Sequence, residues 1–103
     1  PPSEETPMPA FLIVDTDISD PVAYEGYKAA ARPIAESHGG VYRARGGQLD
    51  VIEGDLWRPT RLVIIEFPDR QSAHAFINAP EYQDVQKIRH AASRCTSVLV
   101  DGI

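Results

Sequence analysis

One acidic residue interrupts a stretch of the chain that is otherwise apolar after its first position. Glu66 lies near the end of residues 61–67, which read RLVIIEF. A buried carboxylate must be paired, hydrogen-bonded or neutral, so Glu66 is the best candidate for a general base. Arg89 and Arg61 are the candidates for holding an anionic oxygen of a substrate beside it. The alternative is structural, with Glu66 and Arg89 forming a buried ion pair.

Three tyrosines offer ligand contacts of another kind. Tyr24, Tyr27 and Tyr82 combine apolar rings with hydroxyl groups that need partners when they are buried. With Arg45, they are the candidates for binding a small ligand between helices and sheet, and the alternative is that the tyrosines are ordinary core residues. The arginines of the predicted central hairpin either bind an anion or pair with nearby acidic residues. They are Arg43 and Arg45, expected on one strand face, and Arg58 and Arg61.

Other kinds of site have little support in the sequence. Cys95 is the only cysteine, which excludes an intramolecular disulfide and a cysteine-based zinc site. The three histidines are too widely separated in sequence to form a metal-binding motif. His38 is expected to cap a helix end rather than to take part in catalysis. The chain has no phosphate-loop motif, no dinucleotide-binding motif and no Gly-x-Ser-x-Gly elbow. We therefore predict neither a metal nor a cofactor.

The composition is that of one small acidic domain. The chain has 103 residues, with 15 Asp+Glu, 10 Lys+Arg and a net charge of −5. This length suits a single core, and the negative charge argues against a nucleic-acid partner. No apolar run approaches the roughly 20 residues of a membrane-spanning helix, so we expect no membrane partner. We expect a cytoplasmic protein, although the chain begins at Pro1 without Met, as it would after removal of an N-terminal signal.

Strands and helices are predicted to alternate and to position these side chains. Residues 1–9 hold four of the nine prolines and are expected to form a flexible arm, so the domain spans 10–103. Asp20 and Pro21 are typical of a helix start. A bend or bulge at Gly46 and Gly47 is expected before a further extended stretch at 49–53. Strands are predicted at 11–14, 41–45, 61–67 and 96–100, and helices at 21–38, from 69 to before Pro80, and at 81–92.

This β-α-β-β-α-β order predicts a ferredoxin-like α+β subunit, with a four-stranded antiparallel sheet and its helices on one face. The other face of the sheet then lies open. Residues 11–14 and 61–67 are apolar on both faces, and an uncovered apolar patch of that size is rare on a monomer. We therefore predict a homodimer through the open sheet face, with Val63 and Ile65 at the interface.

An ordered series of short motifs is similar to a known family. The series is Asp20-Pro21, Tyr24, Tyr27, Gly39-Gly40, Arg45-Gly46-Gly47, Glu53-Gly54, Glu66-Phe67-Pro68 and Pro80-Glu81-Tyr82-Gln83. In this order and at these intervals it resembles domain-of-unknown-function family 1330, over roughly Ala10 to Gly102. The resemblance implies a ferredoxin-like subunit of the dimeric α+β barrel group, of bacterial type and without an agreed activity. Phe76 and Asn78 depart from the tryptophan and serine that many members carry there.

The wider group that the chain resembles is similar in fold to cofactor-free monooxygenases, lactone isomerases and haem-binding proteins, so the fold leaves the chemistry open. We predict a cofactor-independent enzyme that acts on a small anionic or aromatic organic compound. In this hypothesis Glu66 handles a proton, Arg89 or Arg61 holds an anionic oxygen, and Tyr24 or Tyr82 positions the compound. The alternative is a dimeric module that binds a small molecule, or serves a structural role, without catalysis.

Overall fold

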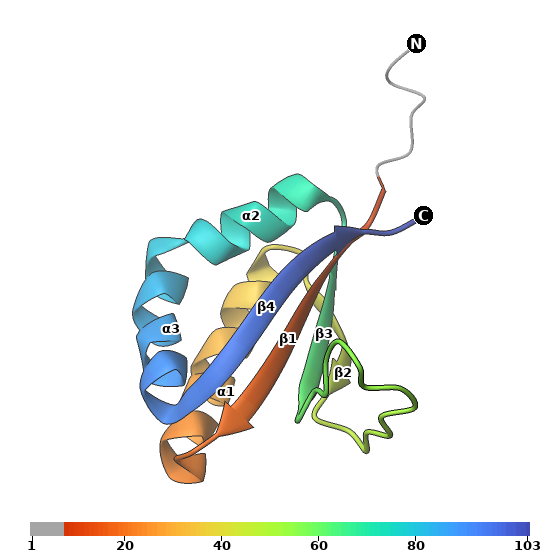
Figure 1. Ribbon diagram of the computed structural model, residues 1–103. Coiled ribbons are helices and arrows are strands. Elements are labelled where there is room, and N and C mark those ends of the chain that lie inside the picture. The colour runs from red at the N-terminus through yellow and green to blue at the C-terminus, as the bar shows by residue number, and fades with distance from the viewer. Residues whose placement is uncertain (1–7) are drawn as a thin grey trace.

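The computed structural model describes residues 8–103, and Figure 1 shows helices packed on a single sheet. The elements follow the predicted order, including the interruption of the second helical segment before Pro80. Residues 1–7, most of the predicted arm, lie outside the described residues. None of the helices within 8–103 is both long and apolar enough to cross a membrane. The elements are β1 (Ala10–Ile18), α1 (Pro21–Ser37), β2 (Val41–Arg45), β3 (Leu62–Phe67), α2 (Arg70–Asn78), α3 (Pro80–Ala92) and β4 (Ser93–Asp101).

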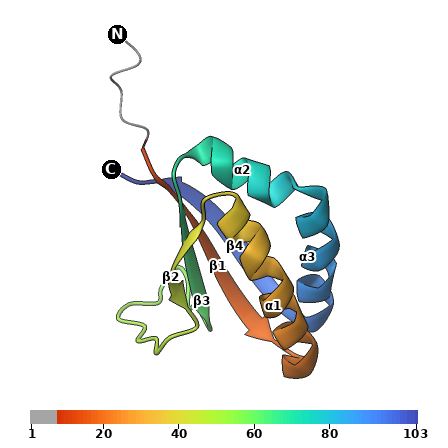
Figure 2. The ribbon, with the colours of Figure 1, turned by 180° about the vertical axis from the view of Figure 1, so that it is seen from behind.

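The four strands form one antiparallel sheet in the order β2-β3-β1-β4. In the central strand β1, Ile13 is paired with Ile64 of β3 on one side and with Val98 of β4 on the other. The helices cover one face of this sheet, as the two opposite views in Figures 1 and 2 show. The predicted ferredoxin-like α+β fold is therefore confirmed.

Aspartates cap the first turns of α1 and α2. Asp20 accepts a hydrogen bond from the amide of Ala23 at 3.1 Å, and Asp69 accepts one from the amide of Ser72 at 2.7 Å. Each side chain satisfies an amide that has no partner inside its helix. Both helix starts were readable from the sequence, and they fix where α1 and α2 leave the sheet.

The core between the helices and the sheet decides which face of β3 is buried. Val63 and Ile65 are only 7% and 4% exposed to solvent, and their side chains lie on the helix-facing side of the sheet. Leu62, Ile64 and Glu66 lie on the opposite, open face. The prediction that Val63 and Ile65 lie on the open face is therefore wrong. Side chains of a strand point alternately to the two faces of the sheet, and in β3 both faces are largely apolar. The sequence pattern alone therefore does not show which face is buried.

Residues 46–61 form an irregular loop between β2 and β3. The expected extended stretch at 49–53 is not a strand, because both edges of β3 are already paired with β1 and β2. Asp15 in β1 holds the end of this loop. It accepts hydrogen bonds from the indole Nε1 of Trp57 at 2.9 Å, the amide of Thr60 at 2.8 Å and the amide of Arg61 at 3.1 Å. The chain therefore enters β3 with Arg61 in a fixed place.

Candidate functional site

A pocket opens between α1, α3 and the helix-facing side of the sheet. The empty space of the pocket, including its open mouth, is about 430 Å³. The enclosed part is much smaller: the centres of water molecules can occupy about 30 Å³ of it, which is room for roughly two waters. Within residues 8–103, its lining combines tyrosines and aliphatic residues with three cations and includes no acidic residue. The lining residues are Leu12, Val14, Tyr24, Tyr27, Lys28, Ala31, Tyr42, Arg45, Arg61, Val63, Ile65 and Tyr82.

Five of the sequence-predicted site residues meet in this pocket. Tyr24 and Tyr27 come from α1, Tyr82 from α3, Arg45 from the end of β2, and Arg61 from the end of the loop. Residues so far apart in the chain converge because α1 and α3 pack side by side over the same part of the sheet. Their role in binding or catalysis stays a prediction.

A hydrogen bond between two tyrosines joins α1 to α3. The hydroxyl oxygens of Tyr27 and Tyr82 lie 2.9 Å apart. Burial raises the pKa of Tyr27 far above its usual value, and the hydroxyl of Tyr82 raises it further. Tyr27 is therefore a neutral hydrogen-bonding group at physiological pH and no candidate for a base.

Arg61 reaches from the loop into the pocket. Its Nη1 donates to the hydroxyl of Tyr24 at 3.2 Å, and its Cζ lies 5.3 Å from the centre of the Tyr24 ring. The side chain runs so close to Gly46, whose φ is +73°, that a Cβ there would come within 2.6 Å of the Arg61 Nε. Since a guanidinium group only donates, the Tyr24 oxygen is the acceptor, and its own proton is left for another partner.

Lys28 and Arg45 stand where the pocket adjoins a shallower groove along α1, because both residues line both hollows. Arg45 Cζ lies 5.7 Å from the centre of the Tyr42 ring. Burial raises the pKa of Tyr42 to about 12, so its hydroxyl also stays protonated at physiological pH. Lys28 also pairs with Glu25 of the groove at 3.1 Å. Within residues 8–103, Arg45 and Arg61 are the lining cations without a salt bridge, and they favour anionic compounds.

Arg43 and Arg45 do not share a face of β2, contrary to expectation. The register with β3 shifts between Tyr42 and Ala44, and a bulge of this kind reverses the alternation beyond it. As a result Arg45 lines the pocket, whereas Arg43 pairs with an acidic residue of the open face.

Glu66 lies on the open face, away from the pocket. Its Oε1 accepts from Nε of Arg43 at 3.0 Å, and its side chain is 30% exposed. The predicted buried ion pair between Glu66 and Arg89 is therefore wrong, because the two side chains lie on opposite sides of the sheet. An exposed pair such as this one contributes only about 0–1 kcal/mol.

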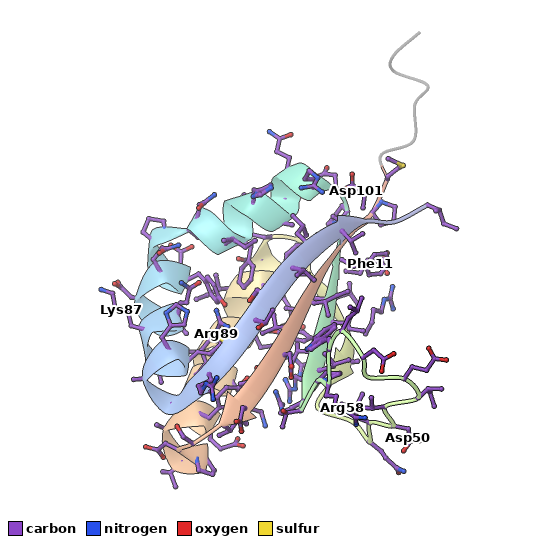
Figure 3. All side chains as sticks on the ribbon, in the orientation of Figure 1. Phe11, Asp50, Arg58, Lys87, Arg89 and Asp101 are labelled. Atoms are coloured by element: carbon purple, nitrogen blue, oxygen red, sulfur yellow. The ribbon has the colours of Figure 1, made fainter. Side chains whose placement is uncertain are left out.

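Arg89 lies beside the pocket and does not line it. Its residue is only 5% exposed, and Figure 3 shows it on the inner side of α3. Its Cζ lies 5.8 Å from the centre of the Tyr27 ring, and the Tyr24 and Tyr27 ring centres are 5.3 Å apart. Two arginines, Arg61 and Arg89, thus flank this pair of tyrosines.

The remaining sequence candidates are accounted for by the structure. His38 lies at the end of α1, where its Nδ1 is 2.9 Å from the carbonyl oxygen of Ile34, so the predicted capping role is confirmed. Cys95 is a partly buried free thiol packed against the core. Over residues 8–103, no group of three or more His, Cys, Asp or Glu is placed to hold a metal ion.

Sequence reasoning missed several residues that shape the site. Tyr42 and Lys28 line the pocket, and Asp15 fixes the loop that carries Arg61. The sequence did contain a signal for Tyr42: it is a large aromatic residue in a predicted strand, and alternate residues of a strand point to opposite faces of the sheet. Nothing local marked Asp15, because its three partners are contributed by the loop more than 40 positions later.

The comparison with protein families matches residues 9–103 to the model described as Domain of unknown function (DUF1330). The chain belongs to this family. The resemblance read from the ordered motifs is thereby confirmed, and the match covers nearly all the described residues. A comparison with curated proteins gives no match.

Several solved structures share the fold of this DUF1330 chain. A protein of unknown function from Rhodopseudomonas palustris superposes with a TM-score of 0.75 at 19% identity, covering 99% of this chain and 88% of that one. SnoaB from Streptomyces nogalater, described as a cofactor-independent oxygenase, gives 0.67 at 15% identity, covering 90% and 91%. A dimeric ferredoxin-like protein of unknown function from Jannaschia sp. gives 0.62 at 16% identity, covering 89% and 97%. At these identities the likeness concerns the fold alone.

Proposed function

We propose that this DUF1330 protein binds a small anionic aromatic compound in the pocket between α1, α3 and the sheet. One observation carries the proposal: the lining combines four tyrosines with Lys28, Arg45 and Arg61 and, among the described residues, contains no acidic one. Aromatic rings favour stacking with a flat ligand, and unpaired arginines favour carboxylates and phenolates. Because the innermost space is narrow, binding requires Lys28 and Arg45 at the entrance to move.

A pair of matched probes tests this function. 2-Naphthoate and its uncharged counterpart 2-naphthamide have nearly the same shape, and their binding is measured by calorimetry. We expect 2-naphthoate to bind at least about tenfold more tightly, since a charge-assisted hydrogen bond contributes roughly 1.5–3 kcal/mol. Arg61→Met reduces this preference, because it removes one of the positive charges that attract the anion, whereas Arg70→Met, which breaks an exposed pair with Asp101, leaves it unchanged. Equal binding of both probes to the native protein contradicts the proposal.

A second candidate function is cofactor-independent catalysis, and the contact between Arg61 and Tyr24 favours it. The Tyr24 proton is left for another partner, so Tyr24 and Arg61 together suit an oxygen on which negative charge develops. Glu66 does not fit the role of base here, since it lies on the open face. The compound must then be acidic enough to lose its proton to water, as a cyclic 1,3-diketone is. The neighbour described as a cofactor-independent oxygenase supports testing for turnover, although a shared fold transfers no activity.

Hydrogen-deuterium exchange separates catalysis from binding alone. In D2O, a cyclic 1,3-diketone loses a C–H proton to solvent and regains a deuteron from it, which proton NMR follows directly. We expect the protein to accelerate this exchange and Tyr24→Phe to slow it by roughly a hundredfold, the usual effect of removing one oxyanion donor. An exchange rate equal to that in buffer leaves ligand binding as the function.

The open face of the sheet supports assembly as a homodimer. Rows of apolar side chains cross three strands there, with Ile13 between Ile64 and Val98 in register. Val98 and Val100 are 47% and 49% exposed. A second copy that packs the same face against this one removes these side chains from water. Two of the similar structures are described as dimeric ferredoxin-like proteins, which supports a dimer here.

A further inference from the structure

We propose that Arg89 and Thr16 form an anion subsite next to the tyrosine pocket, where they hold the carboxylate of the bound compound. The inference deepens the proposed function and rests on it, because it assigns the groups that hold the charged end of the ligand. The subsite lies between α3 and the helix-facing side of β1, and Figure 3 shows Arg89 directed from α3 toward this side.

Arg89 takes a position in α3 that an apolar residue would ordinarily fill. It shares the buried side of the helix with Tyr82 and Ala92. Its Nε and Nη1 atoms are buried without a hydrogen-bond partner among residues 8–103, and no acidic residue in that range forms a salt bridge with it. A buried cation without a counter-charge is strongly unfavourable, so the site is suited to an anion.

Thr16 supplies a second polar group without a partner. It is fully buried, and its Oγ1 has no hydrogen-bond partner in the described part of the chain. The end of β1 is tied to the end of α3, since the carbonyl oxygen of Ala92 accepts from the amides of Ser19 and Asp20 at 2.8 and 3.0 Å. Thr16, on the helix-facing side of β1, and Arg89, on the buried side of α3, thus both belong to the interior between the helices and the sheet. A carboxylate has two oxygens and can accept from both groups.

The surroundings keep Arg89 charged. Burial lowers the pKa of Arg89, but the pKa is raised overall, because Tyr82, Tyr27 and Cys95 attract the guanidinium when they are deprotonated. Cys95 is also the register partner of Thr16 in the sheet, which places the thiol near both groups. These neighbours are neutral when protonated, and no acidic residue within 8–103 pairs with the guanidinium.

Tyr27 connects the subsite to the pocket. One of its contacts is the Arg89 guanidinium, 5.8 Å from the ring centre, and the ring also lines the pocket. A ligand whose ring lies in the pocket therefore brings its carboxylate to Arg89 when the Tyr27–Tyr82 hydrogen bond opens. Arg61 remains on the far side of the tyrosines, at Tyr24, where its positive charge attracts the anionic compound without holding the carboxylate.

The test compares the native protein with Arg89→Met and Arg70→Met, with 2-naphthoate and acetate as probes at constant total salt. Calorimetry gives the affinity for 2-naphthoate, and thermal unfolding gives the response to both anions. We expect Arg89→Met to lose about tenfold or more in affinity and the response to acetate, yet to melt at or above the native temperature without ligand. Replacing an unpaired buried charge by an apolar side chain is often stabilising. Arg70→Met should behave as the native protein.

The possible results show which of the two hypotheses, the subsite or the proposed function, is wrong. If Arg89→Met binds 2-naphthoate as tightly as the native protein, the subsite is wrong and the proposed function stands. If 2-naphthoate does not bind, but acetate raises the melting temperature of the native protein and not of Arg89→Met, the subsite stands alone. If neither anion stabilises the native protein, both are wrong. If Arg89→Met fails to fold, Thr16→Val takes its place, and unchanged affinity there refutes the subsite.

Discussion

The hydroxyl groups of Tyr27 and Tyr82 lie 2.9 Å apart and form a bridge from α1 to α3 over the candidate pocket. Each hydroxyl is the hydrogen-bond partner of the other, and both rings belong to the packed interior. The bridge closes the pocket on the side of Arg89, so it contributes to stability and also controls how far a ligand can enter.

Removing one hydroxyl measures the contribution of this bridge. Tyr82→Phe leaves the Tyr27 hydroxyl buried without a partner, and we expect a loss of about 1–2 kcal/mol in the free energy of unfolding, measured by urea denaturation. The double variant Tyr27→Phe/Tyr82→Phe should recover part of this loss, since no unpaired group remains. Strict additivity of the two single substitutions would show that the hydroxyl groups do not interact in solution.

Alkaline pH should destabilise the fold through its buried tyrosines. Burial raises the pKa of Tyr42 to about 12 and that of Tyr27 further, whereas a tyrosine in the unfolded chain has a pKa of about 10. Above about pH 10 the unfolded state therefore binds fewer protons than the folded state, and stability falls as the pH rises toward 12. Urea midpoints across this range, with the phenolate absorbance recorded in parallel, should show this fall. Tyr42→Phe should reduce it, and a flat profile would contradict the assignment.

Asp15 should control both the loop and its fluorescence. Burial alone would raise the pKa of this carboxyl, but hydrogen bonds from Arg61, Trp57 and Thr60 lower it overall. The carboxylate therefore contributes stability above the unfolded pKa of about 3.9, and this contribution disappears as the pH falls through the lower pKa of the folded state. In Asp15→Asn the fluorescence of Trp57, the only tryptophan, should shift toward that of a solvent-exposed indole at neutral pH. The exposed neighbour gives the control, Asp17→Asn, and an identical shift in both variants would rule out the specific contact.

Two adjacent glycines provide a matched test of how the loop positions Arg61. At Gly46, φ is +73° and a Cβ would lie 2.6–2.8 Å from the Arg61 guanidinium, whereas a Cβ at Gly47 meets nothing within 4 Å. Gly46→Ala should therefore cost about 1–2 kcal/mol in stability and weaken 2-naphthoate binding, because Arg61 must move. Gly47→Ala should leave both quantities nearly unchanged. Equal effects of the two substitutions on binding would show that Arg61 does not depend on this contact.

The open face of the sheet should govern assembly. Ile64→Lys places a charge in the centre of the apolar row formed with Ile13 and Val98, so we expect the dimer to dissociate to monomers in native mass spectrometry and light scattering. Val22→Lys, at a position of α1 that is 85% exposed, is the control and should remain dimeric. Val63 and Ile65 are unsuitable for this test, because both lie in the core and a lysine there would unfold the subunit. An Ile64→Lys protein that remains a dimer would place the interface elsewhere.

The order of the strands and helices could be predicted from the sequence because its signals are local. Asp20 with Pro21, and Asp69 after a proline, mark helix starts that depend only on groups a few positions away. The alternation of strands and helices, with short connections and right-handed crossovers, then leaves few arrangements besides the ferredoxin-like one. The three tyrosines were also candidates in advance, because an apolar ring that carries a hydroxyl group needs a hydrogen-bond partner when it is buried.

Only the tertiary structure decided where the charged groups lie. β3 is largely apolar on both sides, so packing against the helices selected Val63 and Ile65 for the core and left Glu66 on the open face. A bulge in β2 sent Arg43 and Arg45 to opposite sides of the sheet. Local sequence patterns thus determined the fold. The site was determined by which groups from distant segments meet in space, because the free energy of a buried charge depends on those neighbours and not on adjacent residues in the chain.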